Sequence, residues 1–410
     1  MAALTTVADL IMGQSPPSST YNEVGNGLAF FQGKTDFGFL YPTPKLYCSA
    51  PLKIAKPHDI LMSVRAPVGP TNIADRECCI GRGLAAIRPR DIDGDFLFFN
   101  LRYIEKFIAS LGSGSTFHAI SKSQLASLEV NPHKFGLSEQ RKIAGVLGVV
   151  QRAMEQQGRL LALTAELRKT LLHQLFTVGL RGEPQKQTGL GPVPESWGVV
   201  KLGDLFQIKH GFAFDGEFFK PVGRYILLTP GHFFESGGFR DQDQKTKFYT
   251  GEFPHGYLLQ RGELLVVMTE QKEGLLGSSV IVPESGRYLH NQRLGLIQDL
   301  DEARLSKDFL YYLFNTPAVR KRISMTASGS KVRHTSPNKI RDVWVALPSL
   351  EEQHESVKAL AAVDQKLAVT ARKHAALTAL FRTLLHQLMT AQIWVHDLDL
   401  PELAAQAQET

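Results

Sequence analysis

Cysteine is scarce in this chain of 410 residues, which contains only Cys48, Cys78 and Cys79. Three cysteines cannot all pair, the adjacent Cys78 and Cys79 are poorly placed to bridge each other, and no Cys-x-x-Cys spacing occurs. These features argue against a disulfide scaffold and against a cysteine zinc site, and they favour a reducing cytoplasm.

Long apolar runs are also lacking. The run Leu264–Met268 is one of the longest, and it falls far short of the roughly 18 residues that a membrane-spanning helix needs. The first residues, MAALTTVADLIMGQ, have no basic region followed by an apolar segment, which argues against a signal peptide. We therefore expect a soluble, cytoplasmic protein.

Catalytic motifs are equally scarce. Gly33-Lys34-Thr35 resembles the end of a P-loop, but five residues lie between Gly27 and Gly33 where the motif has four, so a turn is the simpler interpretation. The segment 131–134, NPHK, lacks the aromatic residue of an amino-methyltransferase tetrad, and no glycine-rich cofactor loop follows a strand. His173 and His386 have no neighbouring metal ligands, so packing or helix-dipole roles are expected for both.

Composition is that of a folded protein, with 43% hydrophobic and 21% charged residues. The length exceeds one ordinary core and predicts two or three domains. The net charge of +6 permits a polyanionic partner without demanding one.

An internal repeat is the strongest signal in the sequence. Residues 169–177 (KTLLHQLFT) and 382–390 (RTLLHQLMT) are identical at seven of nine positions, with an offset of 213. The same offset aligns LSEQ at 137–140 with LEEQ at 350–353. A repeat unit of this length indicates a duplicated domain, because solenoid repeats run about 20 to 50 residues.

Both repeated segments have apolar residues at three- and four-residue spacing and contain no proline, which predicts long helices of about 38 residues, or roughly 57 Å. Such helices cannot bury an apolar stripe alone, so we expect an antiparallel pair. Two separate core helices are the alternative. Short β-rich runs such as 262–268 and 278–283, with helical stretches near 96–111 and 308–325, make each remaining block a mixed α+β domain.

The sequence thus predicts an α+β protein with pseudo-two-fold symmetry, in which two long antiparallel helices separate two globular domains. The predicted parts are a first domain (1–136), a first helix (137–178), a linker (179–200), a second domain (201–349), a second helix (350–391) and a C-terminal tail (392–410).

One stretch is notable for its charge. No Asp or Glu occurs from Phe309 to Arg341, whereas Lys and Arg recur there together with Ser, Asn and His. Cations neutralise phosphates, and the polar side chains can bond phosphates or base edges. A solvated basic face is the plainer alternative. The first copy has a weaker equivalent, free of acids from Lys106 to Leu128.

Several short motifs recur in a fixed order along the chain. They are GQSP at 13–16, PESW at 194–197 leading to KLGD at 201–204, the Gly-Ser-Gly-Ser loop at 112–115 with its counterpart at 327–330, the Glu-Gln that opens each long helix, and TAEL at 164–167. In these motifs the chain resembles the specificity subunit of type I restriction–modification enzymes over nearly its whole length. The copies depart from each other at two points: the first lacks the Pro-x-x-Trp entry, and the second helix has LTAL at 377–380 in place of TAEL.

The resemblance implies that each block is a target recognition domain and that the helices set the spacing between two unlike half-sites of a DNA target. It implies no catalysis and no cofactor in this subunit. Its partners would be double-stranded DNA, two modification subunits that bind S-adenosylmethionine and methylate adenine, and restriction subunits that use ATP and Mg. The helices would be the docking surface for the modification subunits.

We expect DNA to be contacted by basic and polar residues of both domains. These are Lys34, Ser115, His118, Lys122, Lys209, His210, Arg293, Ser330, Lys331, Arg333, His334 and Lys339. Two other classes of protein remain possible at this point: a stand-alone methyltransferase or nuclease, against which the missing cofactor motifs argue, and a coiled-coil scaffold without DNA specificity, against which the two β-rich blocks argue.

Overall fold

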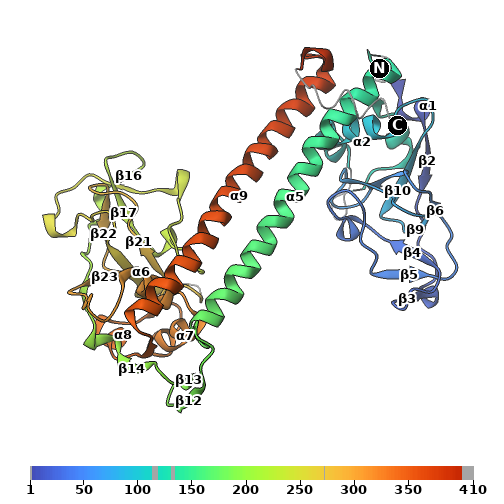
Figure 1. Cartoon of the computed structure of the whole chain (residues 1–410). Helices are drawn as coiled ribbons and strands as arrows, with labels where there is room; N and C mark the ends of the chain where they lie inside the picture. Colours follow the sequence, from blue (N-terminus) through green and yellow to red (C-terminus); the bar gives the residue numbers. More distant parts are fainter. Residues whose placement is uncertain (1, 113–118, 131–133, 272, 399–410) are drawn as a thin grey trace. The chain divides into compact units, whose positions relative to one another are not determined.

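The computed structural model describes residues 2–112, 119–130, 134–271 and 273–398, and it divides the chain into two compact units. Unit 1 comprises Met1–Leu161 with Thr370–Thr410, and unit 2 comprises Ala162–Val369. Each unit therefore contains one of the two blocks together with a part of each long helix (Figure 1).

Unit 1 contains a four-stranded antiparallel sheet and a five-stranded sheet, and the strands of the two sheets are interleaved along the chain. The first sheet has the order β2 (Ala8–Met12), β10 (Leu84–Pro89), β7 (Ile60–Ser63), β8 (Thr71–Ile73). The second has the order β3 (Tyr21–Asn22), β5 (Leu46–Cys48), β4 (Leu28–Phe31), β9 (Cys78–Ile80), β6 (Ile54–Ala55). All pairs are antiparallel except β4 with β9. The three cysteines lie in β5 and β9, where they are free and buried.

Unit 2 repeats this topology. Its first sheet has the order β15 (Gln207–His210), β23 (Leu294–Gln298), β19 (Leu264–Val267), β21 (Ser279–Ile281). Its second has the order β16 (Phe219–Lys220), β18 (Phe248–Tyr249), β17 (Tyr225–Leu228), β22 (Tyr288–His290), again with one parallel pair, β17 with β22. The shared order of strands confirms the predicted α+β class and the duplication behind it.

The remaining elements also correspond between the copies. In unit 1 they are β1 (Ala2–Ala3), which pairs with β11 (Glu129–Val130), and α1 (Leu4–Val7), α2 (Gly94–Tyr103), α3 (Glu105–Leu111) and α4 (Lys122–Ala126). In unit 2 they are β14 (Gly198–Lys201), which pairs with β25 (Trp344–Leu347), β20 (Thr269–Glu270), which pairs with β24 (Arg333–His334), and α6 (Lys307–Phe314), α7 (Pro317–Met325) and α8 (Pro337–Arg341). The helical stretch predicted near 308–325 contains two helices, because Pro317 starts a new one with Thr316 as its N-cap.

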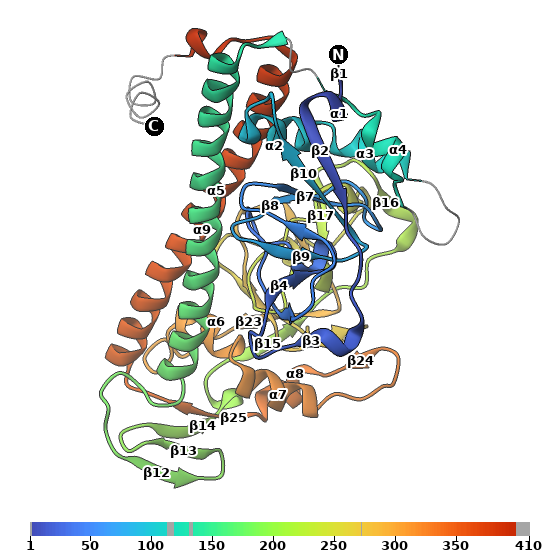
Figure 2. The same ribbon diagram turned by 90° about the vertical axis from the view of Figure 1, so that its right-hand side faces the viewer.

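The two long helices are α5 (Leu137–Leu175) and α9 (Leu350–Thr390). In unit 1 the early part of α5 packs with the late part of α9, and Ile143, Leu147, Leu388 and Met389 share one buried cluster. In unit 2 the late part of α5 packs with the early part of α9, so within each unit the helices run antiparallel (Figure 2).

A glutamine shared by both helix starts explains part of the repeated motif. In unit 1 the Gln140 side chain donates to the carbonyl of Phe135 (3.0 Å) and accepts from the N–H of Asp93 (3.0 Å). In unit 2 the Gln353 side chain donates to the carbonyl of Pro348 (3.0 Å) and accepts from the N–H of Ser306 (2.9 Å). Each glutamine therefore ties the start of a long helix to the start of a helix in its own unit.

The segment predicted as a linker has structure of its own. It forms the hairpin of β12 (Gln185–Thr188) and β13 (Gly191–Pro194), and Trp197 is buried beyond it with its indole N–H directed to the Glu352 carboxylate (3.3 Å). In unit 1 the tail after α9 packs similarly, with Trp394 against the ring of Phe135. Each unit thus has a tryptophan beside the start of a long helix.

Candidate nucleic-acid interface

One edge of the four-stranded sheet in unit 2 gathers residues from distant parts of the chain. Strands β15 and β19 end at this edge and β23 begins there, because both pair antiparallel with β23. Lys209 and His210 close β15, and Arg293 directly precedes β23. Residues more than 80 positions apart are therefore brought to the same place.

The basic segment of the second copy joins the same edge. The N–H of Met268, just after β19, donates to the Arg293 carbonyl (2.9 Å), and the N–H of Thr335 donates to the Met268 carbonyl (2.9 Å). Beyond this point β20 pairs with β24, which contains Arg333 and His334. We call this edge of the sheet in unit 2 the reading edge; it contains Lys209, His210, Arg293, Arg333 and His334.

A glycine allows two loops to cross at this edge. The N–H of Gly211 donates to the Leu294 carbonyl (3.3 Å), and the N–H of Phe212 donates to the His290 carbonyl (2.9 Å). A Cβ atom on Gly211 would lie 1.9 Å from the carbonyl oxygen of Asn291, a distance that no side chain tolerates. The crossing therefore requires glycine at this position.

Unit 1 has the same crossing. Gly13 donates to the Leu84 carbonyl (2.9 Å), and its Cβ position lies 2.1 Å from the Gly81 oxygen. The N–H of Val64 donates to Gly83 (2.9 Å), as Met268 does to Arg293. The N–H of Ile120 donates to Val64 (3.0 Å), as Thr335 does to Met268. The backbone of the reading edge is thus repeated in unit 1.

The residues predicted for the first copy lie around this equivalent edge. Lys34 is exposed in the short helix after β4, and Lys122 is exposed at the start of α4, three residues after Ala119. Ala119 bridges Arg65 at the edge itself. Ser115, His118 and the segment 131–133 lie outside the described residues.

Arg333 is held by the protein. Its guanidinium pairs with Glu270 (3.0 Å) and donates to the Ser324 carbonyl (2.7 Å). The Glu270 side chain is 1% exposed, and its second oxygen accepts from the N–H groups of Gly274, Leu275 and Leu276 at 2.8 to 3.0 Å. Because its charge is balanced by a buried carboxylate, Arg333 anchors the basic loop to β20. That it also contacts DNA stays a prediction.

The other predicted residues of unit 2 divide into two groups. Lys209 donates to the Gly256 carbonyl (2.6 Å) and lies over the Tyr257 ring, Lys339 donates to Thr326 (2.9 Å), and His334 bonds Thr269 (3.0 Å). The His210 ring bonds the Gly211 carbonyl (3.1 Å). Ser330, Lys331 and Arg293 are exposed, and their side chains make no hydrogen bond to any residue in the described part of the chain. The second group is the one available to a ligand.

Residues that the sequence did not single out extend this surface. A pocket of 360 Å³ beside Arg293 is lined by residues that include His232, Gln242, Lys245 and Lys247. The two lysines follow Asp241 and Asp243 in the sequence, so they do not form an acid-free run. Only the pairing of β17 with β18 and β22 brings them beside Arg293.

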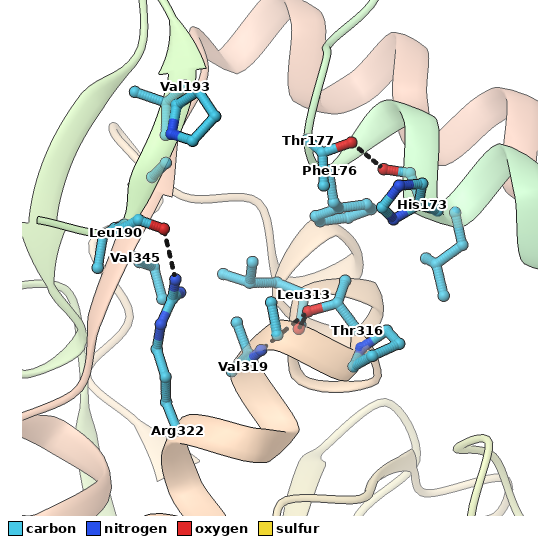
Figure 3. A pocket seen from close by; sticks show the side chains of 15 residues that line it. His173, Phe176, Thr177, Leu190, Val193, Leu313, Thr316, Val319, Arg322 and Val345 are labelled. Carbon is cyan, nitrogen blue, oxygen red and sulfur yellow. Dashed lines mark hydrogen bonds between the residues drawn. The ribbon is translucent and has the colours of Figure 1, made fainter. Parts of the chain in front are cut away.

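His173 lies away from this edge. It lines a largely apolar pocket of 260 Å³ between the end of α5, the β12–β13 hairpin and α7, where Arg322 donates to the Leu190 carbonyl (3.3 Å) (Figure 3). Among the residues that the structure describes, no three His, Cys, Asp or Glu side chains are grouped to hold a metal ion. No helix in the described ranges is long and apolar enough to cross a membrane.

Comparison with known proteins identifies relatives. The family model of the type I restriction modification DNA specificity domain matches residues 4–165 and again 194–379. A Methanocaldococcus jannaschii protein named as the specificity subunit of the type I restriction enzyme MjaX is 43% identical over 174 residues, which is 42% of this chain and only 40% of that relative. The MjaVIII specificity subunit of the same organism is 21% identical over 75% of this chain and 72% of its own length.

Solved structures share the fold. The type I restriction–modification S subunit from M. genitalium superposes with a TM-score of 0.65 over 94% of this chain and 95% of that chain, at 19% identity. A chain from a structural study of complex assembly and conformational transition of the type I R-M system superposes with a TM-score of 0.51 over 95% and 96%, at 17% identity. At these identities the likeness concerns the fold.

Proposed function

Because the chain belongs to the type I restriction modification DNA specificity domain family, we propose that it is the non-catalytic subunit that selects the DNA target of a type I restriction–modification enzyme. In this proposal unit 1 reads one half-site and unit 2 reads the other. The helices α5 and α9 set the spacing between the half-sites, and bases in the spacer are not read.

One observation carries this proposal: the family model matches twice, and each match contains the same glycine-dependent edge. The edge of unit 2 exposes Arg293, Ser330 and Lys331, which suit phosphate and base-edge contacts. The side chains of the two edges differ, which supports two unlike half-sites.

The long helices offer a surface for partner subunits. Leu163 and Leu167, one turn apart on α5, are 62% and 54% exposed, and Val369 on α9 is 46% exposed. Exposed leucines at a four-residue spacing suit a protein partner. We place two modification subunits here, with S-adenosylmethionine bound by them, and with ATP and Mg used by restriction subunits that join the assembly in the cytoplasm.

Two assays on purified protein test this function. We expect the chain alone to bind no S-adenosylmethionine and to transfer no methyl group, and we expect its complex with a cognate modification subunit to methylate adenine in a two-part DNA motif. Methyl transfer by the chain free of partner subunits would favour a stand-alone methyltransferase. Absence of any sequence preference in the complex would favour a scaffold.

A further inference from the structure

A pocket beside the reading edge of unit 2 has the features of a binding site. Its volume is 360 Å³, within the range of roughly 300 to 1,000 Å³ that is usual for ligand pockets. Phe214 and Phe219 form part of its apolar wall, and Asn291, at the loop crossing, forms part of its floor. The pocket therefore adjoins the loops that we assign to DNA.

A buried histidine in the lining has an unused donor. His232 is 4% exposed, and its Nδ1 accepts a hydrogen bond from the backbone N–H of Thr229 (3.1 Å). Burial lowers the pKa of His232, so the neutral ring is favoured. Since Nδ1 accepts, the proton lies on Nε2, and Nε2 has no hydrogen-bond partner among the described residues. This nitrogen has less than 1 Å² of accessible surface, so contacts to a ligand come from the other lining residues.

The rest of the lining is rich in donors. Lys245, Lys247 and Arg293 are exposed cations, and no Asp or Glu is among the described residues that line the pocket. Asp241 is near enough to His232 to favour its charged form, but it is not part of the lining. Lys247 lies over the ring of Phe219 at 5.9 Å, which holds its ammonium group at the pocket wall.

We propose that this pocket receives hydrogen-bond acceptor atoms of DNA in the second half-site, and that Lys245, Lys247 and Arg293 contact them. The inference rests on the proposed function and makes it specific to one pocket. The acceptors have two sources in DNA: the O6 and N7 atoms of guanine in the major groove, which Arg and Lys bond in pairs, and the oxygens of a backbone phosphate.

The test uses the complex with the modification subunit, a DNA library with random positions, and binding titrations over a range of salt. The variants are Arg293→Ala and the double change Lys245→Ala with Lys247→Ala. The control is Arg261→Ala with Lys307→Ala, since both are exposed cations beside Gly262, at the opposite end of β19.

Each source gives a different result. If guanine is bound, Arg293→Ala should weaken selection at one position of one half-site by roughly 10- to 100-fold and leave the other half-site intact. If phosphate is bound, the double lysine variant should weaken all sequences alike and lower the slope of log K against log salt by about 0.9 for each phosphate that the variant no longer neutralises.

The pocket and the function can fail separately. If the wild-type complex selects a two-part motif while both folded variants match the control in motif, affinity and salt slope, the pocket inference is wrong and the function stands. If the wild-type complex selects no motif, the proposed function fails first.

Discussion

The sheet edges of units 1 and 2 share a backbone and differ in side chains. In unit 1, Gly13 follows β2 and crosses the loop before β10, where its N–H donates to the Leu84 carbonyl. In unit 2, Gly211 follows β15 and crosses the loop before β23, where its N–H donates to the Leu294 carbonyl. A short helix follows the first strand of each parallel pair, and its third residue accepts a backbone N–H, but that residue is Asp36 in unit 1 and His232 in unit 2.

Two further positions differ in the same way. Before the crossed loop, unit 1 has Ile80 and unit 2 has the buried His290. Ala66 follows Arg65, which bridges Ala119 in unit 1, and Glu270 follows Thr269, which pairs with His334 in unit 2. Unit 1 therefore has Ala66 where unit 2 has Glu270. The duplicated scaffold thus keeps its hydrogen bonds while the side chains at its edge have different charge and bonding capacity. A shared frame with unlike chemistry is what two unlike half-sites require.

The largest effect should come from the crossing glycines. Gly13→Ala and Gly211→Ala each place a methyl group about 2 Å from a carbonyl oxygen, and each should cost its own unit more than about 3 kcal/mol. Gly33→Ala and Gly216→Ala, with open space around the new atom, are the matched controls. Hydrogen exchange on each variant locates the loss, and equal stability of Gly211→Ala and Gly216→Ala would refute the crossing.

Replacing one buried acid in each unit distinguishes an effect on stability from an effect on DNA selection. Glu270→Ala removes the partner of Arg333 at the reading edge, and Asp59→Ala removes the partner of Arg88 just before β7, at the opposite end of its sheet. Each change should cost about 3 kcal/mol, because a nearly buried ion pair loses one member. Chemical denaturation measures this cost.

Only Glu270→Ala should also weaken DNA selection, at the half-site of unit 2, because it releases the basic loop. An unchanged motif in a folded Glu270→Ala complex would show that the loop does not read DNA.

Acid should weaken unit 2 through a residue that unit 1 lacks. Burial lowers the pKa of His290 to about 4, whereas an unfolded histidine titrates near 6.5. Between these values the unfolded state binds more protons, so stability is full above about pH 6.5 and is lost as pH falls toward 4. At pH 5 the loss should be on the order of 1–2 kcal/mol.

Unfolding followed by hydrogen exchange at pH 7 and pH 5 measures the loss in each unit. Replacement His290→Ile, which copies Ile80, should reduce the pH dependence of unit 2 and leave the part that comes from His232, whose pKa burial also lowers. An unchanged pH dependence in this variant would assign the effect to other groups.

The smallest effect should be that of Lys331, which is exposed and makes no side-chain hydrogen bond in the described part of the chain. Lys331→Ala should lower the salt slope by about 0.9 and leave stability within about 0.5 kcal/mol. Arg333→Ala should lower stability as well, because it leaves the buried Glu270 carboxylate without its cationic partner. Salt titrations with both variants separate the roles, and an unchanged slope in the double variant would exclude this loop from DNA.

Sequence reasoning reached the duplication, both long helices and the basic segment 309–341, because identical motifs and an acid-free run are visible without coordinates. It did not show that Arg333 is paired, since its partner Glu270 lies 63 residues away. Lys245 and Lys247 escaped notice because Asp241 and Asp243 closely precede them in the chain, and only the strand pairing places them beside Arg293. Long-range pairing is the information that a local pattern does not contain.

The spacing role of the long helices can be tested by mapping the methylated motif in cells before and after both helices are lengthened. Seven residues inserted after Leu161 in α5 and after Val369 in α9 add roughly 10 Å while nearly keeping the helical phase. That length corresponds to about three base pairs at about 3.4 Å each. We predict two unlike half-sites that stay the same, with a spacer longer by about three base pairs. A continuous palindrome for the unaltered protein, or altered half-sites with an unaltered spacer after insertion, would contradict this prediction.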